Sequence, residues 1–182
     1  MRIADLAGRR VAVWGFGREG RAALAALQAR LPDSTVKVFC SGAEAEGVRG
    51  AAHAVTTQPD AAALSAFDVV IKSPGISAYR PEIIDAQHNG TRFTSGTALW
   101  FAEHPEARVI AVTGTKGKST VTALIAHLLR ALGRRVALAG NIGLPLLELL
   151  DPPALPDWWV VELSSFQTRA APRVEIGVVN NL

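Results

Sequence analysis

The sequence is poor in cysteine, in net charge and in long apolar stretches, and each shortage excludes a class of protein. Its one cysteine, Cys40, cannot form an internal disulfide framework, which fits a reducing compartment. No run of about eighteen apolar residues occurs, and Asp5 lies where a signal peptide needs its apolar region. We therefore expect a cytoplasmic protein that does not insert into a membrane.

The charged residues are evenly mixed along the chain. Nineteen Lys and Arg face sixteen Asp and Glu, and no block of like charge with interleaved aromatic residues forms a surface for nucleic acid. We expect no nucleic-acid partner. With 182 residues, 49% of them hydrophobic, the composition is that of a globular protein with one large core or two smaller ones.

What the sequence does contain is two successive strand–turn–helix patterns. In the first, an apolar strand over residues 10–14 runs into the glycine turn GFGREG at 15–20, a helix follows, and a strand resumes over 35–40. Such a unit predicts a parallel sheet and a nucleotide site at the turn. NAD is disfavoured because Cys40 lies where an acidic residue would bind the ribose. A glycine turn that serves packing alone is the alternative.

A further strand is predicted over 67–72, followed by the turn SPGIS at 73–77. This turn lies at the carboxyl end of its strand, where open α/β sheets bind ligands. A helix is predicted over 81–88. We expect the polar stretch 89–97 to connect two domains, which places the boundary between residues 1–94 and 95–182.

The second pattern has a strand over 109–113, a loop at 114–117 and a helix from Ser119 to a stop at Gly133. Further strands are predicted over 136–139, 158–163 and 176–180. The predicted fold class is α/β, an N-terminal Rossmann-like parallel-sheet domain followed by a second, truncated α/β domain. The spacing of the apolar helix positions predicts one core-facing side, made of Val121, Leu124, Ile125, Leu128, Leu129 and Leu132.

The loop GTKGKST has the parts that a phosphate site requires. Glycines let the backbone approach the ligand, amide N–H groups converge ahead of a helix N-terminus, and a lysine supplies a cation. The spacing departs from the usual P-loop because Val112 stands where that pattern has its first glycine. A Gly-Lys turn that merely begins a helix is the alternative. The predicted ATP-binding residues are Gly114, Thr115, Lys116, Gly117, Lys118, Ser119 and Thr120.

Glu162 is the strongest candidate for a metal ligand. It ends a run of apolar residues, and a carboxylate there is costly unless it is paired or binds a cation. In a P-loop protein that cation is Mg²⁺, held jointly by a loop hydroxyl and a strand-end carboxylate. We therefore predict that Ser119 and Glu162 bind Mg²⁺.

Three motifs together resemble those of the Mur ligases: VTGTKGKSTVT at 112–122, GNIGLPLLELL at 140–150 and VVELSSFQ at 160–167. The resemblance is greatest to the MurD family, which adds D-glutamate to UDP-N-acetylmuramoyl-L-alanine. It implies a UDP-sugar-binding domain at 1–94, the first part of a central ATPase domain at 95–182, and an amino-acid-binding domain that this sequence lacks.

The resemblance also implies residue roles and chemistry. The substrate carboxylate would attack the γ-phosphate of ATP, and the amine of glutamate would then displace phosphate from the acyl phosphate. Lys118 and Glu162 would be the catalytic residues, in a monomer. The family's later histidine and carbamylated lysine lie beyond residue 182, so we expect no turnover by this chain alone. The residues implied to contact UDP-N-acetylmuramoyl-L-alanine are Phe16, Arg18, Ser41, Gly75, Asn141 and Ser164.

Other functions stay open at this point. Lys116 stands where the family usually has asparagine, and FCSG at 39–42 lacks the family's Asp-Thr-Arg. A relative that adds L-glutamate or uses another muropeptide precursor is therefore an alternative. A ligase of the folylpolyglutamate synthetase type, a P-loop kinase and a non-catalytic nucleotide-binding module are the others.

Overall fold

The computed structural model describes residues 1–49 and 52–181, which form two compact units, Met1–Leu99 and Trp100–Leu182. Helix α5 (Gly96–Glu103) runs across the division. The expected boundary at 94/95 falls one residue before this helix begins. Both units are α/β with parallel sheets, as the sequence predicts.

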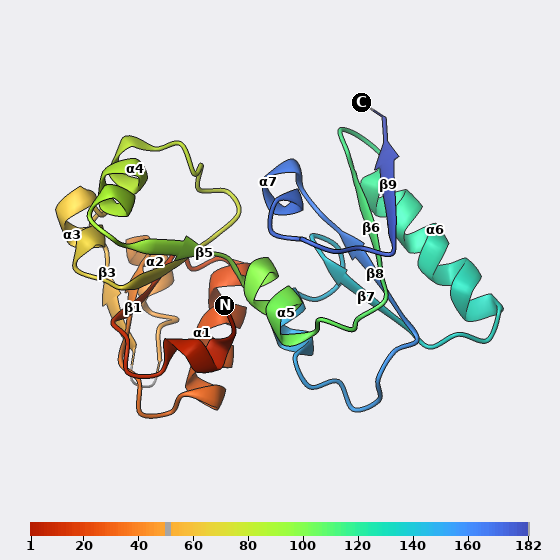
Figure 1. Ribbon diagram of the computed structural model, residues 1–182, viewed down its shortest axis with the longest axis horizontal. Coiled ribbons are helices and arrows are strands. Elements are labelled where there is room, and N and C mark those ends of the chain that lie inside the picture. The colour runs from red at the N-terminus through yellow and green to blue at the C-terminus, as the bar shows by residue number, and fades with distance from the viewer. Residues whose placement is uncertain (50–51, 182) are drawn as a thin grey trace. The chain divides into compact units, whose positions relative to one another are not determined.

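The first unit is built on a five-stranded parallel sheet in the order β3-β2-β1-β4-β5 (Figure 1). The central strand β1 is buried along its whole length, which is typical of a parallel sheet with both faces covered. The predicted strands and helices of this half are present. The elements are η1 (Ile3–Leu6), β1 (Val11–Trp14), α1 (Arg18–Arg30), β2 (Val36–Phe39), α2 (Gly42–Ala45), β3 (Ala52–Val55), α3 (Ala61–Ser65), β4 (Val69–Lys72), α4 (Pro81–His88) and β5 (Arg92–Thr94).

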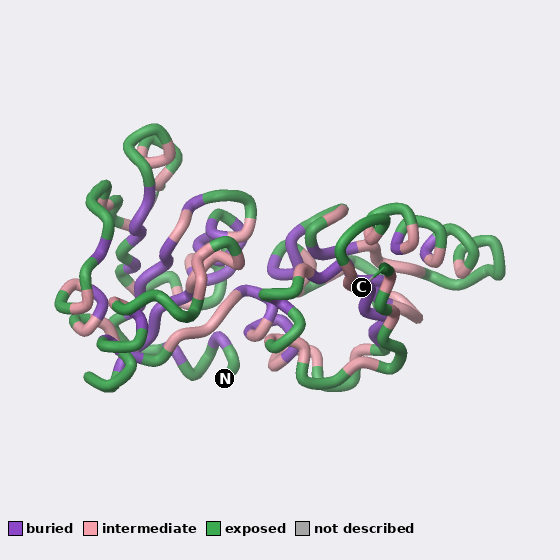
Figure 2. Tube along the Cα trace, turned by 90° about the horizontal axis from the view of Figure 1, so that it is seen from above, coloured by how far each residue is buried: buried purple, intermediate pink, exposed green. Residues whose placement is uncertain are grey.

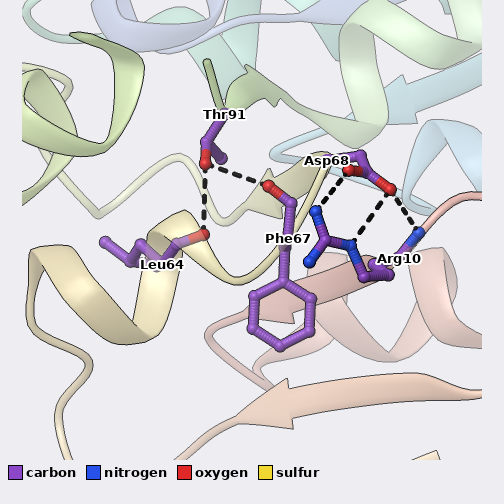
Figure 3. Close-up of polar contacts among 5 residues, drawn as sticks. All are labelled: Arg10, Leu64, Phe67, Asp68 and Thr91. Carbon is purple, nitrogen blue, oxygen red and sulfur yellow. Dashed lines mark hydrogen bonds and ion pairs between the residues drawn. The ribbon is translucent and has the colours of Figure 1, made fainter. Parts of the chain in front are cut away.

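Strand β5 lies inside the polar stretch 89–97, where the sequence predicted no strand. Polar contacts hold the segments that precede β4 and β5 (Figure 3). The buried hydroxyl of Thr91 donates to the carbonyl oxygens of Leu64 at 3.2 Å and Phe67 at 2.9 Å. Asp68 accepts from the backbone N–H of Arg10 and from its guanidinium, each at 2.8 Å. These contacts bring residues 92–94 alongside β4.

The second unit has a four-stranded parallel sheet in the order β7-β8-β6-β9, and β9 lies beside β6 (Figure 1). The crossover helix α6 packs on β6, β7 and β8. All four predicted strands and the long helix are present. The elements are β6 (Val109–Gly114), α6 (Lys118–Ala131), β7 (Val136–Gly140), η2 (Leu146–Leu149), β8 (Trp158–Glu162), α7 (Ser165–Thr168) and β9 (Ile176–Asn180).

The buried side of α6 differs from the prediction. Thr122 and Ala126 are fully buried, whereas Leu124 and Leu128 are 53% exposed and Leu132 is 75% exposed. Small side chains face the sheet because they let the helix approach the strands closely. The leucines lie on one flank of the helix. Buried segments occur in both units (Figure 2). No helix in the described ranges combines the length and apolarity that crossing a bilayer requires.

Candidate functional site

The carboxyl ends of three strands meet at one edge of the second sheet. The register pairs Val112 of β6 and Gly140 of β7 with Glu162 of β8. The segments that follow these strands therefore emerge side by side. They are the phosphate loop after β6, Asn141 after β7 and Ser164 after β8, so the structure brings together every candidate residue predicted in this unit.

The phosphate loop has a backbone shape that requires glycine at its start. Gly114 has a φ of 139°, and a Cβ there would overlap the carbonyl oxygen of Asn180. The loop leads directly into α6, whose first-turn residues Ser119 and Thr120 are exposed. Free N–H groups at the start of a helix and its dipole both favour an anion. The local geometry is therefore suited to phosphate.

Strand β9 holds this loop from the side. The backbone N–H and the hydroxyl of Thr115 donate to the carbonyl oxygen of Asn181, at 3.0 and 2.7 Å. The side-chain amide of Asn180 donates to the carbonyl oxygen of Lys116 at 2.9 Å. Sequence reasoning missed both asparagines, because nothing in a local motif shows which distant residues close the loop.

Lys118 folds back over its own loop. Its Nζ donates to the carbonyl oxygens of Gly114 at 2.9 Å and Thr115 at 3.3 Å, and the residue is half-buried. The ammonium is thus held at the loop, where it adds a positive charge to the oriented N–H groups. Lys116, in contrast, is exposed.

Glu162 is a buried acid with an unused oxygen. The residue is 4% exposed, and its Oε2 has no hydrogen-bond partner among the described residues. A buried carboxylate oxygen of this kind fits a cation ligand. No group of three or more His, Cys, Asp or Glu side chains within the described ranges could hold a metal ion. Mg²⁺ bound here would therefore take its other oxygens from hydroxyl groups such as that of Ser119, from phosphate and from water.

Asn141 and Ser164 flank Glu162 at this edge. The N–H of Asn141 donates to the carbonyl oxygen of Glu162 at 3.1 Å, so the turn after β7 is fixed to the end of β8. The N–H and the hydroxyl of Ser164 both donate to the Oε1 of Gln167, at 3.0 and 2.9 Å. The side chain of Asn141 is exposed and available to a ligand.

In the first unit, two turns meet at the carboxyl edge of the sheet. The N–H of Ser73 donates to the carbonyl oxygen of Trp14 at 2.8 Å, and its hydroxyl donates to that of Gly15 at 3.1 Å. Gly15 has a φ of 89°, and a Cβ there would lie 2.6 Å from the Oγ of Ser73. The turns 15–17 and 73–76 therefore form one hydrogen-bonded assembly.

A cavity of about 230 Å³ opens beside these turns. Its apolar walls are Trp14, Phe39 and Ile76, and its polar side chains include those of Thr57, Gln58 and Arg80. The guanidinium of Arg80 lies 5.2 Å from the centroid of the Trp14 ring. Apolar walls with a few polar groups are typical of a small-molecule site. Sequence reasoning missed Thr57, Gln58 and Arg80, which belong to no recognisable motif.

The predicted contact residues of the first unit occupy different positions. Phe16 is 2% exposed, so its ring packs inside the unit and only its backbone can face a ligand. Arg18 begins α1 and is exposed. The N–H and hydroxyl of Ser41 donate to Glu44, each at 2.9 Å, beside the cavity. Gly75 lies in the turn 73–76 with open space around it.

Cys40 also lines this cavity, and burial raises the pKa of its thiol. Cys40 is buried, and a raised pKa favours the neutral thiol over the reactive thiolate. A larger cavity of about 720 Å³, whose lining includes Arg108 and Trp158, lies in the second unit at the amino-terminal edge of that sheet. None of the candidate residues lines this larger cavity.

The chain is similar in sequence to known ligases. Residues 112–182 match the family model of the Mur ligase middle domain. A UDP-N-acetylmuramoyl-L-alanine–L-glutamate ligase of Xanthomonas axonopodis pv. citri is 54% identical over all of this chain and 42% of its own length. The ligase of that name from Xylella fastidiosa (strain Temecula1) is 53% identical over 92% of this chain and 38% of its own length. The chain thus spans about two-fifths of the length of these relatives.

A solved structure supports the fold. The UDP-N-acetylmuramate:L-alanyl-γ-D-glutamyl-meso-diaminopimelate ligase of Neisseria meningitides superposes with a TM-score of 0.53 at 21% identity. The match covers 96% of this chain and 60% of that protein. At this identity the likeness concerns the fold alone, and it agrees with the predicted N-terminal and central α/β domains.

Proposed function

We propose that the chain is the substrate- and ATP-binding part of an ATP-dependent amino-acid ligase, because residues 112–182 match the Mur ligase middle domain. The observation that carries this proposal is the edge of the second sheet. There a phosphate loop with Lys118 lies beside a buried carboxylate, Glu162, whose Oε2 has no partner among the described residues. The first unit would hold the UDP-sugar.

The chemistry follows from the difficulty of amidating a carboxylate. An oxygen of the substrate carboxylate attacks the γ-phosphorus of ATP, the bond to ADP breaks, and an acyl phosphate results. The amine of the amino acid then attacks the acyl carbon, phosphate leaves, and the nitrogen loses a proton. Lys118 and the loop N–H groups would orient the γ-phosphate and stabilise its developing charge. Mg²⁺ at Ser119 and Glu162 would neutralise phosphate charge.

The incoming amino acid is proposed to be L-glutamate. The sequence resemblance alone favoured a D-glutamate ligase, but the relatives at 53–54% identity are named as ligases that add L-glutamate. The departures at Lys116 and at residues 39–42 agree with a branch distinct from the D-glutamate enzymes. The second substrate would be UDP-N-acetylmuramoyl-L-alanine, as in those relatives' names.

The test of substrate binding is calorimetric titration of the 182-residue chain with UDP-N-acetylmuramoyl-L-alanine, with NAD⁺ as the control ligand. Binding of the UDP-sugar alone supports the proposal, and binding of NAD⁺ alone contradicts it. A titration with Mg²⁺ and a non-hydrolysable ATP analogue tests the second unit, with Lys118→Ala as the variant and the exposed Lys37→Ala as its control. Loss of nucleotide binding in Lys118→Ala only is the expected result.

The choice between enantiomers is tested on a protein that contains this chain and has the full length of its relatives. Phosphate release in the presence of ATP and UDP-N-acetylmuramoyl-L-alanine should depend on added L-glutamate. Release that depends on D-glutamate instead would restore the first interpretation. Release with neither amino acid would contradict the ligase proposal.

A further inference from the structure

Lys72 is an unusual residue to find at the end of a buried strand. It follows three buried residues of β4 and is itself half-buried. Its Nζ donates to the carbonyl oxygen of Ile76 at 2.8 Å, and no described carboxylate lies within ion-pair distance of it. Burial lowers the pKa of this ammonium. A partly buried charge without an acid partner costs stability, so packing alone does not account for a lysine here.

The group that Lys72 holds is part of the cavity wall. Ile76 lines the cavity and packs against the buried cluster that contains Trp14. Its N–H donates to the carbonyl oxygen of Ser73 at 3.1 Å, which closes the turn, and Lys72 holds the other side of the same peptide segment. The conformation of this wall therefore depends on two hydrogen bonds, one of them from the Lys72 ammonium.

The same turn is tied to the glycine turn after β1. Lys72 pairs with Trp14 in the sheet register, and Ser73 bonds to the carbonyl oxygens of Trp14 and Gly15. Lys72 thus lies at the end of β4, directly before the turn 73–76. This turn and the turn 15–17 after β1 together border the cavity. A change in its hydrogen bond would release Ile76 without disturbing the strands beneath.

We propose that Lys72 is a positioning residue for nucleotide binding: it holds the turn 73–76 so that Ile76 forms a wall of the cavity that receives the nucleoside. This inference rests on the proposed binding of a UDP-sugar by the first unit. It also accounts for the half-buried ammonium, whose desolvation lowers the stability of the free protein while it keeps the site preformed.

The experiment compares Lys72→Met, which keeps the length of the side chain but removes the donor, with Lys72→Arg, which keeps a donor. Lys37→Met is the matched control, because Lys37 is exposed on the neighbouring strand β2. UDP affinity is measured by calorimetry and the melting temperature by differential scanning calorimetry. We expect Lys72→Met to weaken UDP binding about tenfold, with Tm unchanged or raised. Lys72→Arg should recover most of the affinity, and Lys37→Met should match the wild type.

A positioning role predicts that Lys72→Met weakens UDP binding without lowering Tm. A merely structural role predicts that both fall. If Tm falls together with affinity in Lys72→Met, the lysine only stabilises the unit and the inference is wrong. Unchanged UDP affinity in Lys72→Met overturns it as well, and leaves the proposed function intact. If neither the wild type nor Lys37→Met binds UDP, the proposed function fails and this inference fails with it.

Discussion

Replacing Glu162 by glutamine should stabilise the protein in metal-free buffer and abolish its response to magnesium. Glu162 is 4% exposed, and its Oε2 has no partner among the described residues. A buried polar atom left without a partner costs about 1–3 kcal/mol, and more when it is charged. Glutamine has the same shape and no charge, so we expect a gain of about 1 kcal/mol, which raises Tm by about 4–8 °C in a domain of 60–100 residues.

The assay is differential scanning calorimetry of the wild type, Glu162→Gln and the exposed control Glu148→Gln, each with a non-hydrolysable ATP analogue, with and without Mg²⁺. The wild type and Glu148→Gln should gain stability on addition of Mg²⁺, because ligands that bind only the folded state raise Tm. Glu162→Gln should begin higher and gain little. A lower Tm for Glu162→Gln without metal, or a magnesium response equal to that of the wild type, would refute the reasoning.

Three further predictions concern the loop, the helix flank and the first unit. Gly114→Ala should abolish binding of the ATP analogue in calorimetry, because its Cβ would overlap the Asn180 carbonyl, whereas Gly177→Ala, with open space around it, should bind normally. Leu124→Gln combined with Leu128→Gln should reduce any self-association seen in sedimentation at constant Tm, since both leucines are 53% exposed; equal association would exclude this flank. Hydrogen bonds from Arg10 lower the pKa of Asp68 to about 2, so its contribution is complete above the unfolded pKa of about 3.9 and is lost as pH falls through about 2. Acid unfolding of Asp68→Asn should therefore be less steep between about pH 4 and 2 than that of the exposed control Asp33→Asn, and identical curves would contradict this assignment.

The sequence predicted the central strands because buried parallel strands are continuous β-branched runs. Strands β3 and β5 gave no such signal. Residues 52–55 are Ala-His-Ala-Val, and β5 has only three residues, so each forms because a neighbouring strand offers its edge. The spacing in α6 predicted a helix correctly, but it could not show that Thr122 and Ala126, rather than the leucines, would face the sheet.

The candidate site likewise contains residues that the sequence predicts and residues that only the structure shows. The phosphate loop and Glu162 lie within short motifs whose chemistry depends on neighbours in sequence, so they could be named in advance. The side chains of Asn180 and Lys72 act on the backbone of turns, and Arg80 lies over a tryptophan 66 positions earlier in the chain. Such contacts form when distant strands pair, so they cannot be predicted from the spacing of residues within a short motif.

The attachment of the phosphate loop to β9 has a consequence for the order in which the protein forms. Thr115 is bonded to a residue 66 positions later, so the loop acquires its shape only after β9 has paired with β6. Loop-closure entropy must be paid before that contact is made, which makes it a late step in folding. A nascent chain that has formed β6 and α6 therefore has the complete motif, but the proposed ATP site is not yet formed. If ATP binds at this site, it can stabilise the domain only once synthesis has passed residue 181.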